Sequence, residues 1–270
     1  MTRPPVALSI AGSDPSGGAG IQADLKTFSA LGAYGCAAMT ALTAQSTRGV
    51  TGVHVVPPEF VREQVTTLVD DVRVDAVKIG MLATAEIVEE VARLVDDVLD
   101  CPVVLDPVMV STSGSRLLDD DAVAAMRRLV PLAGAVTPNL HEAAVLLDAE
   151  PASSVDEMRW QARQLIDLGA KRVLLKGGHA TGAQAVDVWA DGPRDAVELT
   201  EPRIDTHNTH GTGCSLSSAI AALLPQRDGW LPAVRDAKHW LTGALEAARD
   251  LEIGHGPGPV HHFHQLWSSR

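Results

Sequence analysis

Short apolar runs rich in β-branched residues alternate along the chain with longer segments whose apolar residues recur at helical spacing. The short runs predict strands over residues 6–11, 36–43, 52–56, 74–79, 102–105, 135–137, 172–176 and 185–189. The longer segments predict helices over residues 20–31, 58–70, 84–99, 119–129, 140–147, 155–168, 213–224 and 231–251. Such alternation is typical of an α/β fold with a mainly parallel sheet, in which ligands bind beyond the carboxyl ends of the strands.

The chain shows no internal repeat, low-complexity tract or long linker that would divide it. Its 270 residues suffice for one large α/β domain or two small ones. We therefore expect a single domain over residues 1–270. Residues 254–259 are rich in glycine and proline, so we expect them to be irregular.

Composition narrows the classes of function. The chain carries 34 acidic and 22 basic residues, a net charge of −12, and only 3% aromatic residues. A nucleic-acid or membrane-surface binder needs a basic face, and single-stranded nucleic acid needs stacking aromatics, so we expect neither nucleic acid nor membrane as a partner. A phosphate ligand stays possible, because it needs only a local cluster of donors.

The three cysteines, Cys36, Cys101 and Cys214, are odd in number and far apart. This pattern predicts neither a disulfide framework nor a zinc site, and a reducing cytosol is its natural compartment. The sequence opens without the pattern of a signal peptide, and no apolar run reaches the length of a membrane helix. These features predict a cytoplasmic protein.

Two glycines, Gly211 and Gly213, stand immediately before an apolar helical pattern. Glycine lets backbone N–H groups approach a ligand, and a helix N-terminus adds unpaired donors and partial positive charge. Together they predict a hole for a phosphate or for charge that develops in a transition state. Cys214 would lie in the first turn, where the pKa of a thiol tends to fall. The alternative is an ordinary helix capped by Thr212 with an inert cysteine after it.

A second glycine-rich segment, residues 12–20, follows the first predicted strand and opens the first helix. It has the glycine spacing of a P-loop, but Gly18 stands where that loop needs lysine. A dinucleotide-binding loop needs an acidic residue at the end of the next strand, and residues 40–46 contain none. We expect a loop that brings backbone close to a small substrate, with a plain tight turn as the alternative.

Polar or sulfur-containing residues follow four predicted strands: Gln45, Met81, Asp106 and Asn139. Each alone could be a helix cap or a solvated loop residue. Because the carboxyl ends of parallel strands share one edge of the sheet, the four together indicate a ligand site.

Two further residues point to phosphate chemistry. Glu142 lies three residues after Asn139, about one helical turn on. This pair could hold a magnesium ion through water molecules, as that ion prefers. Lys176 ends another predicted strand and could meet a phosphate, although its spacing alone favours a surface charge.

Seven segments, in order along the chain, resemble the motifs of bacterial hydroxymethylpyrimidine/phosphomethylpyrimidine kinases of thiamine biosynthesis. They are residues 11–24 (AGSDPSGGAGIQAD), 43–47 (TAQST), 78–82 (KIGML), 106–109 (DPVM), 137–143 (TPNLHEA), 176–179 (KGGH) and 210–214 (HGTGC). The resemblance covers residues 6–251. It implies the ribokinase-like fold, a three-layer sandwich with a central, mostly parallel sheet flanked by helices, and it implies a homodimer.

The resemblance also implies a reaction: ATP-dependent phosphorylation of 4-amino-5-hydroxymethyl-2-methylpyrimidine to its monophosphate and then to the diphosphate. It assigns the anion hole and the catalytic base to Gly211, Thr212, Gly213 and Cys214. It places around the pyrimidine Gly12, Asp24, Gln45, Met81 and Val108. It assigns to the magnesium ion Asp106 and Glu142, and to the ATP phosphates Asp106, Asn139 and Lys176.

Two other functions stay open on the sequence. A pyridoxal kinase of the cysteine-containing type, or a dual-specificity enzyme, would differ at the ring, whose size and substituents meet Gln45, Met81 and Val108. A non-catalytic pyrimidine-binding protein is the other alternative. It would have no need of an anion hole beside a pair of magnesium ligands, so Cys214 and Glu142 speak against it.

Overall fold

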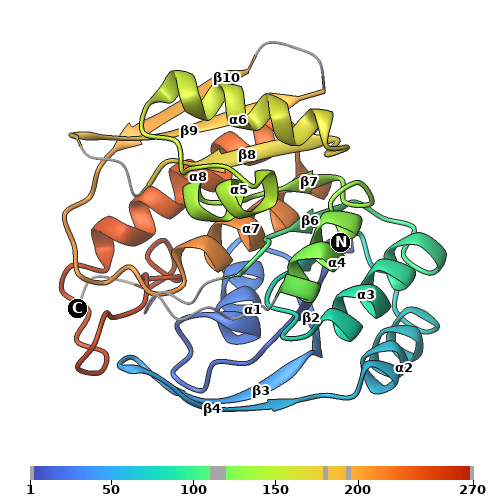
Figure 1. Cartoon of the computed structure of the whole chain (residues 1–270). Coiled ribbons are helices and arrows are strands. Elements are labelled where there is room, and N and C mark those ends of the chain that lie inside the picture. Colours follow the sequence, from blue (N-terminus) through green and yellow to red (C-terminus); the bar gives the residue numbers. More distant parts are fainter. Residues whose placement is uncertain (1–2, 110–119, 179–181, 193–195, 268–270) are drawn as a thin grey trace.

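The computed structural model describes residues 3–109, 120–178, 182–192 and 196–267. Its centre is an eight-stranded sheet with the order β10-β9-β8-β7-β6-β5-β1-β2 (Figure 1). The strands from β2 to β8 in that order pair in parallel, and β9 and β10 extend the sheet in antiparallel fashion. Their bounds are β1 (Val6–Ala11), β2 (Tyr34–Met39), β5 (Ala76–Ile79), β6 (Val103–Leu105), β7 (Ala135–Val136), β8 (Arg172–Lys176), β9 (Gln184–Asp191) and β10 (Val197–Pro202).

Helices cover both faces of this sheet. They are α1 (Gly20–Ala30), α2 (Pro58–Val69), α3 (Ala85–Asp97), α4 (Asp120–Leu129), α5 (Leu140–Leu147), α6 (Val155–Asp167), α7 (Thr212–Leu223) and α8 (Trp230–Ala247), with a short 3-10 turn (Leu224–Gln226) after α7. One apolar cluster packs the five helices from α2 through α6 against one face of the sheet. A second cluster packs α1, α7 and α8 against the other face. The arrangement is the predicted three-layer sandwich.

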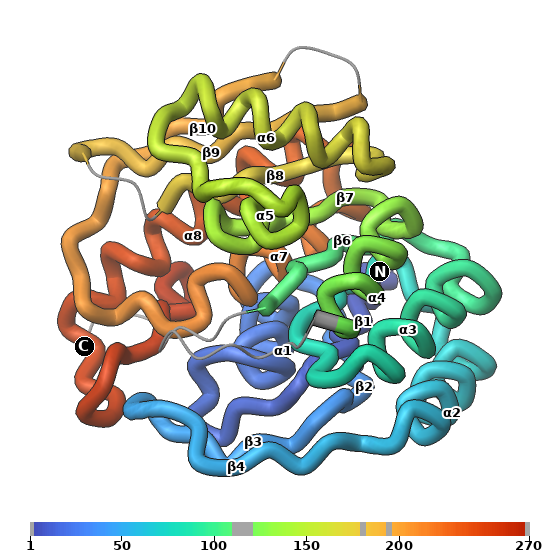
Figure 2. The backbone as a smooth tube through the Cα atoms, viewed as in Figure 1, coloured from blue at the N-terminus to red at the C-terminus, as the bar shows by residue number. Residues whose placement is uncertain are grey.

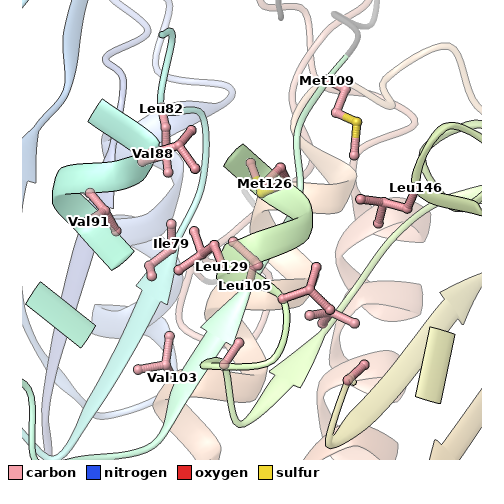
Figure 3. Packing of buried hydrophobic residues seen from close by; sticks show 14 of the residues in the cluster. Ile79, Leu82, Val88, Val91, Val103, Leu105, Met109, Met126, Leu129 and Leu146 are labelled. Carbon is pink, nitrogen blue, oxygen red and sulfur yellow. The ribbon is translucent and has the colours of Figure 1, made fainter. Parts of the chain in front are cut away.

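Strand β6 shows how the sequence builds two cores. Val103 and Leu105 belong to the first cluster, and Val104 between them belongs to the second. Figure 3 shows Leu105 near Met126 and Leu129 of α4. Because successive side chains point to opposite faces of a strand, a strand covered on both faces needs a continuous apolar run.

Most predicted helices begin and end within a few residues of their observed bounds, and side-chain caps fix the starts of α3, α5 and α6. Thr84 accepts a hydrogen bond from the backbone N–H of Ile87 at the start of α3 (3.4 Å), and Ser154 accepts one from Glu157 at the start of α6 (3.2 Å). Residue 119, the predicted start of α4, lies outside the described residues. The helix predicted over residues 231–251 ends earlier, at Ala247.

The single strand predicted over residues 36–43 is wrong. The strand is interrupted at Thr40. The N–H of Thr40 donates to the carbonyl of Ala11 (3.0 Å), and its hydroxyl donates to the carbonyl of Met81 (2.6 Å). After the break, β3 (Ala41–Ser46) leaves the main sheet and pairs antiparallel with β4 (Gly49–Val55). The apolar run continues through the break, so hydrophobicity alone carries no sign of it.

The β3–β4 hairpin stands apart from the main sheet, and its tip approaches the C-terminal segment (Figure 2). Thr47 in its turn accepts hydrogen bonds from the backbone N–H groups of His255 (3.2 Å) and Gly256 (3.1 Å). Residues 254–259 form no helix or strand beyond one isolated bridge, as predicted. The tail therefore helps to hold the hairpin.

The pattern of hydrophobic runs does not predict β10. This strand carries exposed Glu198 and partly exposed Glu201, and it forms the outer edge of the sheet, where only one face is covered. An edge strand with polar residues has no continuous apolar run to mark it. Among the described residues, no helix combines the length and apolarity needed to span a membrane.

Candidate active site

A cleft of about 1620 Å³ follows the edge of the sheet at which the parallel strands end. Met81, Asp106, Asn139 and Lys176 all line it, so the structure brings together the strand ends that the sequence pointed to. The first turn of α7 and the β3–β4 hairpin complete the walls. A single small-molecule site typically occupies about 300–1,000 Å³, so this cleft has room for two ligands side by side.

Gln45 reaches the cleft by a different route from the one predicted. It does not end a strand of the main sheet; it lies within β3, opposite Val50 of β4. The pairing slips between Ala44 and Gln45, and such bulges redirect side chains beside functional sites. Val53, on the same side of the hairpin, lines the cleft and is 51% exposed. The hairpin thus presents one amide among apolar side chains.

Helix α7 begins at the predicted anion hole. Gly211 is its N-cap with φ 77°, and a Cβ there would overlap the carbonyl of Gly18. A Cβ on Gly213 would lie 3.2 Å from Nζ of Lys176 and 3.7 Å from Oδ2 of Asp106. The N–H groups of the first turn, which have no partner within the helix, therefore open beside an ammonium and a carboxylate.

The predicted depression of the Cys214 pKa is wrong. Burial raises the pKa of this thiol to about 11. The ammonium of Lys78 and a hydrogen bond from the backbone N–H of Gly20 lower it, but Asp24 and Asp106 raise it further. A helix N-terminus favours a thiolate only where water or cations outweigh desolvation, and here desolvation is the largest effect. Cys214 therefore holds its proton at neutral pH.

Lys176 and two carboxylates form a compact charged group. Its Nζ lies 2.8 Å from Oδ1 of Asp106 and 3.9 Å from Oε2 of Glu142. The hydroxyl of Thr137 also donates to Asp106 (3.1 Å). Burial raises the pKa of Glu142 to about 7; Lys176 opposes this shift and Asp106 adds to it. Two carboxylates thus share one cation, which leaves the group able to accept another positive charge.

Asn139 and Glu142 are also a capping box for α5. The side chain of Asn139 accepts from the N–H of Glu142 (2.9 Å), and Oε2 of Glu142 accepts from the N–H of Asn139 (2.7 Å). The capping role that the sequence offered as an alternative is therefore real. Both side chains still line the cleft.

The residues implied for the pyrimidine separate into two groups. Gly12, Met81 and Val108 line the cleft, as Gln45 does. Asp24 does not: its side chain is completely buried, and its oxygens accept hydrogen bonds from protein donors. Asp24 has no surface left for a substrate, so the implied direct contact is corrected. His179, the last residue of one motif, lies outside the described residues.

Sequence reasoning missed a contact between the two glycine-rich loops. Nε2 of His210 lies 2.7 Å from Oδ2 of Asp14, and both residues line the cleft. Asp14 also accepts from the backbone N–H groups of Ser16 (2.9 Å) and Ala19 (2.8 Å). The pair therefore fixes the substrate loop against the residue that precedes the anion hole. The Asp-Pro-Ser turn was a local signal, but its partner is 196 residues away.

Comparison with known proteins decides the family. The family model for phosphomethylpyrimidine kinase matches residues 14–261. The chain belongs to this family. The chain is 54% identical to the hydroxymethylpyrimidine/phosphomethylpyrimidine kinase of Escherichia coli (strain K12) over 262 residues, 97% of this chain and 98% of the relative. Like its relatives, this member of the phosphomethylpyrimidine kinase family is a phosphotransferase.

Solved structures agree on the fold of the family. A phosphomethylpyrimidine kinase from Clostridium difficile 630 has a TM-score of 0.78 and 38% identity, with 89% of this chain and 99% of that chain covered. The pyridoxal kinase from Staphylococcus aureus in complex with AMP-PCP and pyridoxal has a TM-score of 0.88 and 32% identity, with 98% and 96% covered. The ribokinase-like fold and the family resemblance are confirmed.

Proposed function

We propose that this phosphotransferase phosphorylates 4-amino-5-hydroxymethyl-2-methylpyrimidine with ATP, first to the monophosphate and then, in the same cleft, to the diphosphate. One observation carries the proposal: the helix-start donors of α7, the Lys176–Asp106 pair and Gln45 all border one cleft large enough for two ligands. Phosphoryl transfer depends on positioning and charge neutralisation more than on covalent chemistry, and this cleft offers both.

Gln45 and the apolar side chains around it would bind the ring. An amide donates and accepts, so it can pair with the edge of an aminopyrimidine. Met81 offers a polarizable contact to the ring face. At the other end of the cleft, the N–H groups of Gly213 and Cys214 would hold the phosphoryl group as its charge builds.

The two steps differ in what they need from Cys214. In the first step the nucleophile is a hydroxyl, and we propose that Cys214 accepts its proton. Because burial raises the pKa of Cys214 to about 11, the rate of this step should increase with pH as more thiolate forms. In the second step the nucleophile is a phosphate oxygen, already ionised at neutral pH, so no base is needed.

Magnesium and the ATP phosphates fit the charged group around Lys176. Magnesium typically takes one or two protein carboxylates, with water and phosphate completing its shell, and it offsets phosphate charge. The raised pKa of Glu142 reflects a buried carboxyl with too little positive charge around it. We propose that Asp106 and Glu142 hold the ion, and that Lys176 and Asn139 contact the phosphates.

The test is an ATP-consumption assay with hydroxymethylpyrimidine, its monophosphate and pyridoxal as separate substrates. We expect turnover of the first two and two ADP formed for each hydroxymethylpyrimidine consumed. Pyridoxal is the second candidate, favoured by the similarity to a pyridoxal-bound kinase. Turnover of pyridoxal alone would replace the pyrimidine assignment, and binding without ADP formation would favour a non-catalytic protein.

We propose in addition that two copies assemble and that the protein works in the cytoplasm. The family resemblance supports the dimer, and the free thiols of Cys36, Cys101 and Cys214 support a reducing compartment. Sedimentation of the purified chain would give its mass. A monomer at micromolar concentration would contradict the assembly.

A further inference from the structure

Beneath the anion hole lies an ion pair to which the proposed reaction gives no role. The ammonium of Lys78, at the third position of β5, lies 2.8 Å from Oδ2 and 3.0 Å from Oδ1 of Asp24 in α1. Both side chains have 0% of their surface exposed. Burying two charges is expensive, and a pair of this kind often adds no net stability over apolar residues. Stability alone therefore does not explain why this pair is present.

The surroundings of Asp24 place this pair alongside the cysteine. The hydroxyls of Ser9 and Ser218 each donate to Asp24 at 2.6 Å. Ser218 follows Cys214 by four residues in α7, so the two share one face of the helix, one turn apart. Lys78, bound to the same carboxylate, borders the cleft that Cys214 lines, although its side chain is fully buried.

The charged groups that act on the Cys214 sulfur include Lys78 from β5, Asp24 from α1, Asp106 after β6 and Lys176 at the end of β8. Lys78 lowers the pKa of Cys214, whereas Asp24 and Asp106 raise it. Charges act strongly here because protein rather than water separates them. The two members of the buried pair thus pull the thiol in opposite directions.

We propose that Lys78 and Asp24 are positioning residues that set how readily Cys214 gives up its proton. Lys78 keeps a positive charge near the sulfur, and Asp24, held by two hydroxyls, fixes that charge in place and limits its effect. The inference rests on the proposed role of Cys214 as the base. Its physical content, the acidity of the thiol, can be measured without any substrate.

A purely structural role predicts something different. The pair connects α1, β5 and, through Ser218, α7, so it could serve only to fasten these elements. In that case loss of either charge would loosen the packing and expose Cys214, and both variants would react faster with a thiol reagent. If the pair instead sets the acidity of Cys214, the two variants must differ in how fast Cys214 reacts with the reagent.

The experiment is alkylation of Cys214 by iodoacetamide between pH 7 and 9.5, with the labelled peptide quantified by mass spectrometry. The variants are Lys78→Met and Asp24→Asn. Cys36 and Cys101 in the same digest serve as internal references. Glu90→Gln, which disturbs a carboxylate of α3 paired with Arg62 and Arg93, is the control for general loosening. Lys78→Gln, whose amide can still donate to Asp24, replaces Lys78→Met if that variant does not fold.

We expect Lys78→Met to slow alkylation of Cys214 about tenfold at a given pH, because a nearby opposite charge typically moves a pKa by one unit or more. Asp24→Asn should be no slower than the unaltered protein, and Glu90→Gln should change nothing. Two variants that both react faster, or that react at the same rate as each other, would overturn the proposal.

A kinase assay separates this inference from the proposed function. Lys78→Met should lower phosphorylation of hydroxymethylpyrimidine at neutral pH more than that of its monophosphate. If alkylation separates the two variants but turnover of both substrates stays normal, the inference about acidity holds and the base role of Cys214 is what fails.

Discussion

Two lysine–aspartate pairs border the first turns of α7, and they differ in how far protein atoms satisfy them. In the Lys78–Asp24 pair, both side chains are fully buried and two serine hydroxyls complete the coordination of the carboxylate. In the Lys176–Asp106 pair, the lysine side chain is 13% exposed and a second carboxylate, Glu142, lies 3.9 Å from its Nζ.

The difference indicates what each pair is for. A pair whose hydrogen bonds are all made within the protein resists change, and it supplies a fixed field. A pair that faces a cleft, with carboxylates in excess, changes partners when phosphates or a cation arrive. Identical residue types therefore do different work, and burial rather than chemistry decides which.

The largest expected effect comes from breaking the Lys78–Asp24 pair. Asp24→Ala leaves the Lys78 ammonium buried without a partner, which should cost about 3–5 kcal/mol of unfolding free energy. Asp106→Ala should cost much less, because Lys176 can turn to Glu142 or to water. Urea unfolding of both variants measures the difference. Equal losses of stability would erase the distinction between the two pairs.

The Lys176–Asp106 pair should affect the rate of phosphoryl transfer more than the stability of the protein. Lys176→Ala should lower both phosphorylation steps by about 10²–10³-fold, since each step loses a charge that stabilises the phosphates. Lys171→Ala, which removes an exposed ammonium that donates to the carbonyl of Leu132 (3.3 Å), is the matched control. Steady-state turnover with each substrate is the measurement, and a loss confined to one step would contradict a shared site.

Gln45 should govern substrate affinity at the far end of the cleft. Gln45→Leu should weaken pyrimidine binding by roughly 1–3 kcal/mol, because polar edges of the ring lose their partner. The affinity for ATP should barely change. Calorimetric titration with each ligand tests this, and an equal loss for both would mean that Gln45 supports the hairpin or the nucleotide.

Glu142 should produce the smallest effect, a change in the pH dependence of stability. Burial raises its pKa to about 7, so the folded protein keeps a proton that the unfolded chain loses near 4.5. Stability from this group therefore falls as pH rises from about 4.5 to 7. The Tm of Glu142→Gln, measured relative to that of the unaltered protein, should rise as pH increases across that window. Above about pH 7 this difference in Tm should stay constant.

Exposed Glu157 offers the matched control. Hydrogen bonds from Ser153 lower its pKa, so its contribution is present above about pH 4.5 and is lost in acid. Glu157→Gln should therefore show no gain in Tm as pH rises. A gain in both variants would indicate an effect of charge removal in general.

The sequence predicted the layers of the fold because continuous apolar runs mark strands buried on two faces, as in β6. It could not predict the break at Thr40, whose partners are Ala11 at the end of β1 and Met81 in the loop after β5. The cleft residues at strand ends could be predicted as well, because the carboxyl ends of parallel strands share one edge of the sheet. The burial of Asp24 and the raised pKa of Cys214 were not, because both depend on residues far apart in sequence.

The central claim is that one cleft performs two phosphorylations and that only the first needs Cys214. The direct measurement is product formation by Cys214→Ala from hydroxymethylpyrimidine and, separately, from its monophosphate. We predict a loss of about 10²–10⁴-fold in the first step, the usual worth of a general base, and a second step within a few-fold of normal. Equal loss in both steps, or near-normal turnover of hydroxymethylpyrimidine, would contradict the account.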